Sequence, residues 1–134
     1  LASKDVIHQK KEILKNTLVK ISKTQCRGNC PSYELTLFNN GTIHFKGIKN
    51  VVFIGSKSFL LKHEKLKTIK TLFAKTEFNI HPKSYVDNNL KDIQSTFITY
   101  NNKQIEITLW NKVPKELVLA YKTVEDILFE KKLI

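Results

Sequence analysis

Several features that point to particular functions are missing from this sequence. It has no run of about 18 apolar residues that could span a bilayer, and no short apolar segment behind a basic start that would predict a signal peptide. It also lacks a glycine-rich phosphate loop, a G-x-S-x-G motif and a recognisable Ser/His/Asp arrangement. Nothing in the spacing of the acidic residues brings two carboxylates into one cleft. We therefore expect no enzyme activity and no cofactor.

Arginine is nearly absent too. Arg27 is the single arginine among 23 basic residues, in a chain of formal net charge +11. Nucleic-acid recognition leans on the planar guanidinium group, so a nucleic-acid partner is not favoured. A solvated lysine surface is the simplest account of the charge. The alternative is a lysine-rich binder of anionic ligands, either lipid headgroups or nucleic acid, that uses the lysines of residues 62–75.

Methionine does not occur, and the chain begins at Leu1. We expect that an upstream segment has been removed and that any export signal or lipid anchor lay in it; a lipid anchor there would attach the protein to a membrane. The 134 residues, of which 41% are hydrophobic, suffice for one core. Residues 1–16 are expected to form a short helix or a tether, and residues 17–134 a single domain.

Alternating apolar residues predict strands in the first half of the chain. Residues 17–24 form a β-branched run. Residues 50–54 (NVVFI) predict either a further buried strand or the continuation of the strand before them. Between them, a three-residue loop at residues 39–41 places all apolar partners of a hairpin on one face. The partners are then Leu37 and Ile43, Leu35 and Phe45, and Tyr33 and Gly47. Gly41 is expected in the left-handed position of this turn.

The second half predicts two helices and another hairpin. An amphipathic helix is expected over residues 62–76 and a second one from Pro114 to Glu130. Between them, residues 79–92 have no period and are expected to form a long irregular connection that binds a ligand or covers a sheet edge. A turn at Asn102 and Lys103 would follow. Its pairs are Tyr100 with Ile105, Ile98 with Ile107, and Thr96 with Leu109.

The order of these elements is β-β-β-α-β-β-α. It predicts an α+β fold of two layers, with an antiparallel sheet of four to five strands and both helices on one face. The other face carries alternating polar residues and is expected to be wet.

The stretch QCRGNCPSYELTLFNNG, residues 25–41, holds both cysteines, Cys26 and Cys30. The spacing is not C-x-x-C and no helix follows, which argues against a reactive thiol. The histidines are too scattered for a metal site. They are His8, His44, His63 and His81. We favour a disulfide across a tight turn, in which Gly28 supplies conformational freedom and Pro31 directs the chain into the next strand. A thiol-dependent redox enzyme is the second alternative.

The pattern Cys26-x-Gly28-x-Cys30-Pro31-x-Tyr33, followed by alternating apolar residues up to Gly41 and Gly47, resembles the signature of a domain family of unknown function found in bacterial envelope proteins and lipoproteins. The resemblance extends over about residues 19–128 and departs at Arg27, where the family often has an aromatic or small residue. It implies a compact α+β domain and a structural cysteine pair. It also implies export to the periplasm, the outer membrane as a lipoprotein, or the cell surface, and no known enzyme activity.

The function expected from all this is that of a non-enzymatic, exported interaction or accessory domain. Its partner would be another envelope protein, bound through the wet sheet face, a sheet edge or residues 79–92. The candidate binding residues are Tyr85, Asp87, Asp92 and Trp110. A binding patch is expected if Tyr85 and Trp110 are exposed together.

Overall fold

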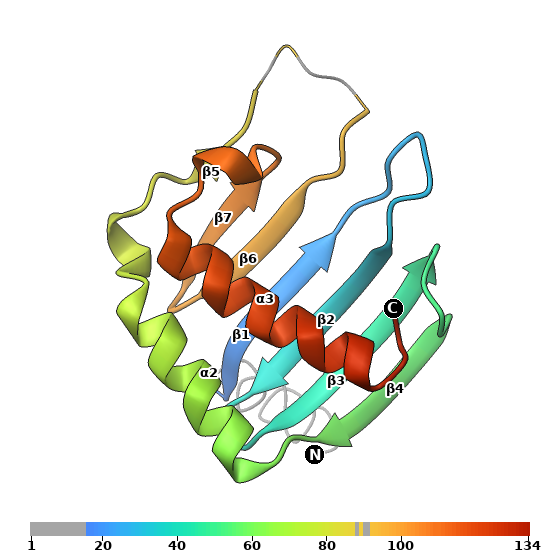
Figure 1. Cartoon of the computed structure of the whole chain (residues 1–134), viewed down its shortest axis with the longest axis vertical. Helices are drawn as coiled ribbons and strands as arrows, with labels where there is room; N and C mark the ends of the chain where they lie inside the picture. Colours follow the sequence, from blue (N-terminus) through green and yellow to red (C-terminus); the bar gives the residue numbers. More distant parts are fainter. Residues whose placement is uncertain (1–15, 88, 90–91) are drawn as a thin grey trace, which may run out of the picture.

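One sheet, covered on one side by two helices, forms the domain (Figure 1). The structure is a computed structural model that describes residues 16–87, 89 and 92–134. The expected helix or tether at the N-terminus lies, except for Asn16, outside the described residues. The elements are β1 Thr17–Lys23, β2 Ser32–Phe38, β3 Thr42–Lys49, β4 Gly55–Leu60, α2 His63–Lys75, η1 Phe78–Ile80, β5 Ser84–Tyr85, β6 Thr96–Tyr100, β7 Lys103–Ile107, η2 Trp110–Lys112 and α3 Lys115–Glu130.

The predicted sheet of four to five antiparallel strands is wrong. Within the described residues the sheet has seven strands in the order β4-β3-β2-β1-β6-β7-β5, and β5 runs parallel to β7. Two strands had no clear signal in the sequence. β4 is an edge strand, GSKSFL, without the alternation of a half-buried strand, and β5 has only two residues. The sheet is therefore mixed.

The apolar run at residues 50–54, predicted as a strand, is instead the reversal between β3 and β4. Asn50 and Gly55 flank it at positive φ values of 58° and 116°. Both residue types tolerate this left-handed region, which a regular strand does not use. The apolar composition of the run suggests a buried strand, but Val52 and Ile54 are exposed.

The register predicted for the first hairpin is confirmed. Leu37 pairs with Ile43, Leu35 with Phe45 and Tyr33 with Gly47. Gly41 has a φ of 94°, as the turn required. The five side chains of these pairs face the helices and are buried, and the sixth residue, Gly47, has no side chain.

The register predicted for the second hairpin is wrong by two residues. Tyr100 pairs with Lys103, and the turn residues are Asn101 and Asn102, at φ values of 52° and 64°. Two consecutive left-handed residues make a two-residue hairpin loop of the type that asparagine favours. A shift by two leaves the same side chains on the buried face, so alternation alone did not distinguish the two registers.

Both long helices lie across the same face of the sheet (Figure 1). Their buried stripes agree with the sequence patterns. In α2 the buried residues are Leu66, Ile69 and Phe73, and in α3 they are Leu117, Ala120, Tyr121, Val124, Ile127 and Leu128. No helix in the described part of the chain is long and apolar enough to cross a membrane.

The connection after α2 is more ordered than predicted. It contains η1 and the short strand β5, which pairs with the edge of β7. The Glu106 amide donates to the Lys83 carbonyl, and the Thr108 amide donates to the Tyr85 carbonyl. Covering a sheet edge was one of the two roles expected for this segment. The pairing of β5 with β7 also fixes the positions of His81 and Tyr85.

Candidate functional site

The two cysteines lie in the loop between β1 and β2. Their sulfur atoms are 2.04 Å apart, at the distance of a disulfide bond. Among the residues that the structure describes, no group of three or more His, Cys, Asp or Glu side chains could hold a metal ion. This arrangement agrees with a structural pair.

Gly28, at the middle of this ring, does not have the role that the sequence suggested. Its φ is not among the positive values, and an added Cβ would meet only the Cys26 sulfur, at 4.0 Å. The ring therefore closes without a backbone conformation that only glycine adopts.

The cysteine loop is tied to the residues before β6. The Gln94 side-chain amide donates to the carbonyl oxygens of Thr24 and Pro31, and the Ser95 amide donates to the Thr24 hydroxyl. Asp92 lies 3.7 Å from Arg27 in an exposed ion pair. Such a pair contributes little to stability, so the backbone-directed bonds of Gln94 hold the loops together.

Replacing both Cys26 and Cys30 with serine should lower the free energy of unfolding by about 2 kcal/mol, because so short a ring removes only a modest chain entropy. Urea denaturation of the oxidised protein and of the variant measures the difference. Intact mass should rise by two hydrogen atoms when reductant is added to the unfolded wild type. An unchanged mass would show that the native cysteines are thiols.

A second cluster is buried beneath α3, around Lys23. The ammonium group donates a 2.6 Å hydrogen bond to the Tyr121 hydroxyl, which in turn donates a 2.6 Å bond to the Glu125 carboxylate. The same ammonium lies 5.0 Å from the Tyr121 ring centre and 5.8 Å from that of Trp110. Burial lowers the pKa of Lys23, and the Glu125 charge opposes this effect. Burial also raises the pKa values of Tyr33 and Tyr121.

The Lys23 cluster is a structural network and not an open site. Lys23 is only 8% exposed, so a substrate would have no access to its amine. Lys23 is not among the predicted site residues, although its place in the strand is a signal for burial. Lys23 follows Val19 and Ile21 at alternate positions and therefore points to the buried face.

Replacing Lys23 with methionine should leave stability at pH 7 unchanged or raise it by about 1 kcal/mol, because an apolar side chain needs no compensation for burial of a charge. In the wild type, the folded state binds fewer protons than the unfolded state between the lowered pKa and the ordinary value of 10.5. Stability should therefore rise with pH as this window is entered. The variant should lose this slope.

Chemical denaturation between pH 7 and 9.5 tests this expectation. The upper limit avoids tyrosine ionisation, which would lower stability above about pH 10 because the pKa values of Tyr33 and Tyr121 are raised in the folded state. Equal slopes in the wild type and the variant would contradict the assignment to Lys23.

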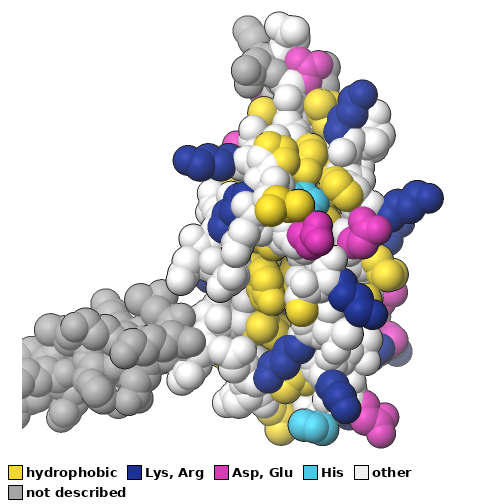
Figure 2. All heavy atoms as spheres, turned by 90° about the vertical axis from the view of Figure 1, so that its left-hand side faces the viewer, with side chains coloured by type: hydrophobic (Ala, Val, Ile, Leu, Met, Phe, Trp, Pro, Cys, Tyr) yellow, Lys and Arg dark blue, Asp and Glu magenta, His cyan; other side chains and the backbone are white. Residues whose placement is uncertain are grey.

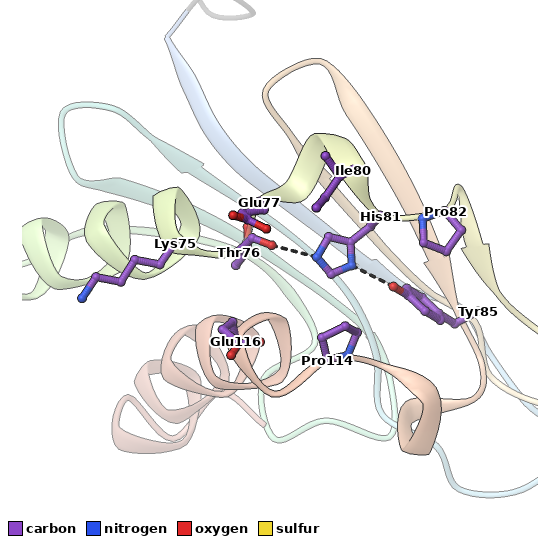
Figure 3. A pocket seen from close by; sticks show the side chains of 9 residues that line it. All are labelled: Lys75, Thr76, Glu77, Ile80, His81, Pro82, Tyr85, Pro114 and Glu116. Atoms are coloured by element: carbon purple, nitrogen blue, oxygen red, sulfur yellow. Dashed lines mark hydrogen bonds between the residues drawn. The ribbon is translucent and has the colours of Figure 1, made fainter.

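The described surface has a pocket of about 470 Å³ where the end of α2, η1, β5 and the start of α3 meet; we call it the His81 pocket. Figure 3 shows His81 at its centre, with Tyr85 on one side and Thr76 on the other. Its lining consists of Lys75, Thr76, Glu77, Ile80, His81, Pro82, Tyr85, Pro114 and Glu116. Figure 2 shows hydrophobic side chains exposed on this side of the molecule, beside acidic and basic ones.

Two hydrogen bonds fix the His81 ring in place. Nε2 lies 2.8 Å from the Thr76 carbonyl oxygen, and Nδ1 lies 2.8 Å from the Tyr85 hydroxyl (Figure 3). A carbonyl oxygen only accepts, so Nε2 carries a proton; in the neutral ring Nδ1 then accepts from the Tyr85 hydroxyl. Burial raises the pKa of Tyr85. Both ring nitrogens are thus engaged inside the protein, which suits a rigid wall better than a catalytic base.

The rim of the His81 pocket carries charge. Glu77 comes from the turn after α2, where its backbone adopts a left-handed φ of 52°, and Glu116 comes from the first turn of α3. Figure 3 shows Lys75 directed away from His81, whereas the two glutamates flank the pocket. Ile80 at the rim is 77% exposed. The arrangement provides an apolar wall with two carboxylates, which fits a ligand that is partly apolar and positively charged.

The four candidate binding residues do not form one patch. Tyr85 lines the His81 pocket, and its ring contacts His81. The centre of the Trp110 ring instead lies 4.5 Å from the centre of the Tyr121 ring, in the Lys23 cluster. Asp92 pairs with Arg27, and the Asp87 carboxylate accepts a bond from the Asn89 amide. Part of the predicted segment, residues 79–92, lines this pocket, whereas its other lining residues come from separate elements and were not predicted.

The comparisons with known proteins agree with the coarse picture. No curated protein matches this sequence. Residues 17–128 match a family described as "Domain of unknown function (DUF6438)", a span that begins at β1 and ends within α3. Since the match covers more than half of the chain, the protein belongs to the DUF6438 family.

Proposed function

We propose that this domain is a non-enzymatic interaction module of an exported envelope protein, and that its partner docks at the His81 pocket. The observation that carries the proposal is the construction of this pocket: His81 is held on both sides by hydrogen bonds, so the wall exists before a ligand arrives. A preformed pocket binds without the cost of ordering its own side chains. The groups that line it include no activated nucleophile.

The cysteine pair supports the exported location. Disulfides persist in oxidising compartments and are rare in the cytosol. In this domain the ring between Cys26 and Cys30 lies in the loop that joins β1 to β2, and within the described residues neither cysteine belongs to a group that could hold a metal ion. A structural disulfide therefore fits a periplasmic or cell-surface protein better than a cytosolic one.

The partner that fits the pocket is a protein segment with one basic side chain between apolar ones. Glu77 and Glu116 supply two negative charges and Lys75 one positive charge, so the charged side chains of the lining are net negative in a molecule whose overall charge is +11. This local reversal of sign would steer a basic side chain to the pocket and away from the rest of the surface. Ile80, Pro82 and Pro114 provide the apolar contacts.

A titration followed by NMR of backbone amides tests the proposal. The probe is the acetylated and amidated peptide Leu-Val-Lys-Pro-Leu, compared with the same peptide carrying glutamate in place of lysine. The lysine peptide should shift the amides of residues 76–85 and 115–116. Charge reversal by Glu77→Lys or Glu116→Lys should weaken its binding about tenfold, because the rim attraction turns into repulsion.

The matched control is Glu34→Lys, which makes the same change of charge at an exposed position of β2. It should leave the affinity unchanged. Equal binding of the two peptides, or shifts confined to residues outside the pocket, would refute the proposed docking site.

A further inference from the structure

β4 is an open edge of the sheet. It pairs with β3 on one side, and no strand in the described part of the chain pairs with its other side. The Leu61 amide donates to the Gly41 carbonyl, and in an antiparallel ladder the bonded positions alternate. Positions 55, 57 and 59 therefore bond to β3. The amides and carbonyls of Ser56, Ser58 and Leu60 point outward, where another strand could pair with them.

This edge carries one lysine, Lys57, but has neither the proline nor the bulge that often prevent pairing with another strand. Its outward positions hold two serines and a leucine, without proline, and the register with β3 runs from Thr42 to Gly47 without a bulge. Exposed apolar side chains lie at both ends: Ile54 is 61% exposed and Leu60 is 67% exposed. Apolar side chains and free backbone groups are the two requirements for strand addition.

The charge around β4 is strongly one-sided. Residues 42–65, which run from β3 through β4 to the start of α2, contain five lysines, one glutamate and no aspartate, which is a net charge of +4. On the helix side of the edge, the Lys57 ammonium lies 5.4 Å from the Phe53 ring and the Lys131 ammonium 5.2 Å from the Phe59 ring. None of these cations has an ion-pair partner within the described residues. An added strand would therefore meet uncompensated positive charge.

A pocket of about 370 Å³ lies at the end of β4, between the start of α2 and the end of α3. Leu60, Leu61 and Ile127 form its apolar part, and three lysines and one glutamate surround it: Lys62, Lys65, Lys131 and Glu130. It is placed to receive one apolar side chain of a segment that runs along β4.

From these observations we propose that β4 binds an extended acidic segment of a partner protein by strand addition. The backbone of that segment pairs with Ser56, Ser58 and Leu60, its carboxylates face Lys57 and Lys131, and one apolar side chain enters the pocket at the end of β4. A second copy of this chain would bring the same lysines against each other, and residues 1–15 are also rich in lysine. This site lies at the opposite edge of the sheet from the His81 pocket and does not depend on it.

Residue-resolved hydrogen exchange of the full chain tests the inference. The probe is an acetylated and amidated octapeptide of alternating glutamate and valine, and the control has lysine for glutamate. The acidic peptide should slow exchange of the Ser56, Ser58 and Leu60 amides at least tenfold and leave positions 57 and 59, already bonded to β3, nearly unchanged. Binding should weaken at 0.5 M salt.

Variants separate backbone pairing from charge. Ser58→Pro removes the central outward amide at an edge position that tolerates proline, and should abolish binding. Lys57→Glu should weaken binding about tenfold, whereas Lys83→Glu, near the other edge, should not. If Ser58→Pro does not fold, the exchange patterns of the wild type and of Lys57→Glu distinguish strand addition from attraction by charge alone.

Four outcomes would overturn the inference. One is binding of the acidic peptide without slower exchange of the Ser56, Ser58 and Leu60 amides, which would mean that the lysines attract any anion. Another is binding of phosphatidylglycerol vesicles but not of the peptide, which means a membrane surface. The third is equal binding of the lysine control. The last is slow exchange at these three amides before any peptide is added, which means that the chain covers its own edge.

Discussion

Replacing Gly47 with alanine should lower the free energy of unfolding by about 3 kcal/mol or more, because the strand has no room for a Cβ atom. The added atom would lie 1.8 Å from the Phe53 carbonyl oxygen and 2.8 Å from a methyl group of Val51. A carbonyl oxygen is backbone and does not rotate away. Relief requires residues 50–53 to move, and the Phe53 amide anchors them to the Leu133 carbonyl.

Urea denaturation of this variant should be compared with that of Gly28→Ala, the matched control. Gly28 has no positive φ, and its nearest neighbour to an added Cβ is 4.0 Å away. The control should change stability by less than about 0.5 kcal/mol. A similar loss in both variants would mean that the close approach at Gly47 does not exist in solution.

Replacing Tyr121 with phenylalanine should cost about 2–3 kcal/mol, because it removes one oxygen that serves two charged groups. Lys23 would lose its hydrogen-bond acceptor and Glu125 would lose its donor. A buried ammonium without a partner is far more costly than a lost bond between neutral groups. The pKa of Lys23 should then fall further, and the rise of stability with pH should become steeper.

A double-mutant cycle isolates this interaction. In the Lys23→Met background the same Tyr121→Phe change should cost less, with a coupling of about 1–2 kcal/mol, because the ammonium that needed the oxygen is gone. Denaturation of the wild type, both single variants and the double variant gives the coupling directly. Additive effects would contradict the hydrogen bond between Lys23 and Tyr121.

The sequence predicts best where a single buried face decides the answer. In the first hairpin, a two-residue loop at Asn40 and Gly41 would put Leu37 opposite His44. The three-residue loop gives it an apolar partner, Ile43, so this choice of loop was predictable. In the second hairpin, two registers that differ by two residues bury nearly the same side chains. The left-handed turn at Asn101 and Asn102 determines the register of this hairpin, and the alternation of apolar residues carries no information about the turn.

The edges of the sheet were hidden for another reason. β4 has little burial to enforce an apolar pattern, and β5 is held by backbone bonds to the Lys83 and Tyr85 carbonyls that any sequence can make. The apolar run at residues 50–54 appeared more strand-like than either. Strand number was therefore underestimated.

The candidate site was predictable only as a segment. Residues 79–92 were singled out by their length and lack of period, and part of this segment does line the His81 pocket. Glu77 and Glu116 come from segments far apart in the sequence, and His81 gains its place through the Thr76 carbonyl, which any residue type would offer. Tertiary contacts of this kind leave no local pattern.

The central claim is that a partner docks at the His81 pocket, and photo-crosslinking tests it most directly. A photoreactive amino acid at position 80, whose side chain is 77% exposed at the rim, should give one discrete adduct with another protein in intact cells that make this domain. The adduct should disappear when Glu77→Lys and Glu116→Lys are combined with it, and should persist with Glu34→Lys. No adduct from position 80, or an adduct that survives both charge reversals, would contradict the claim.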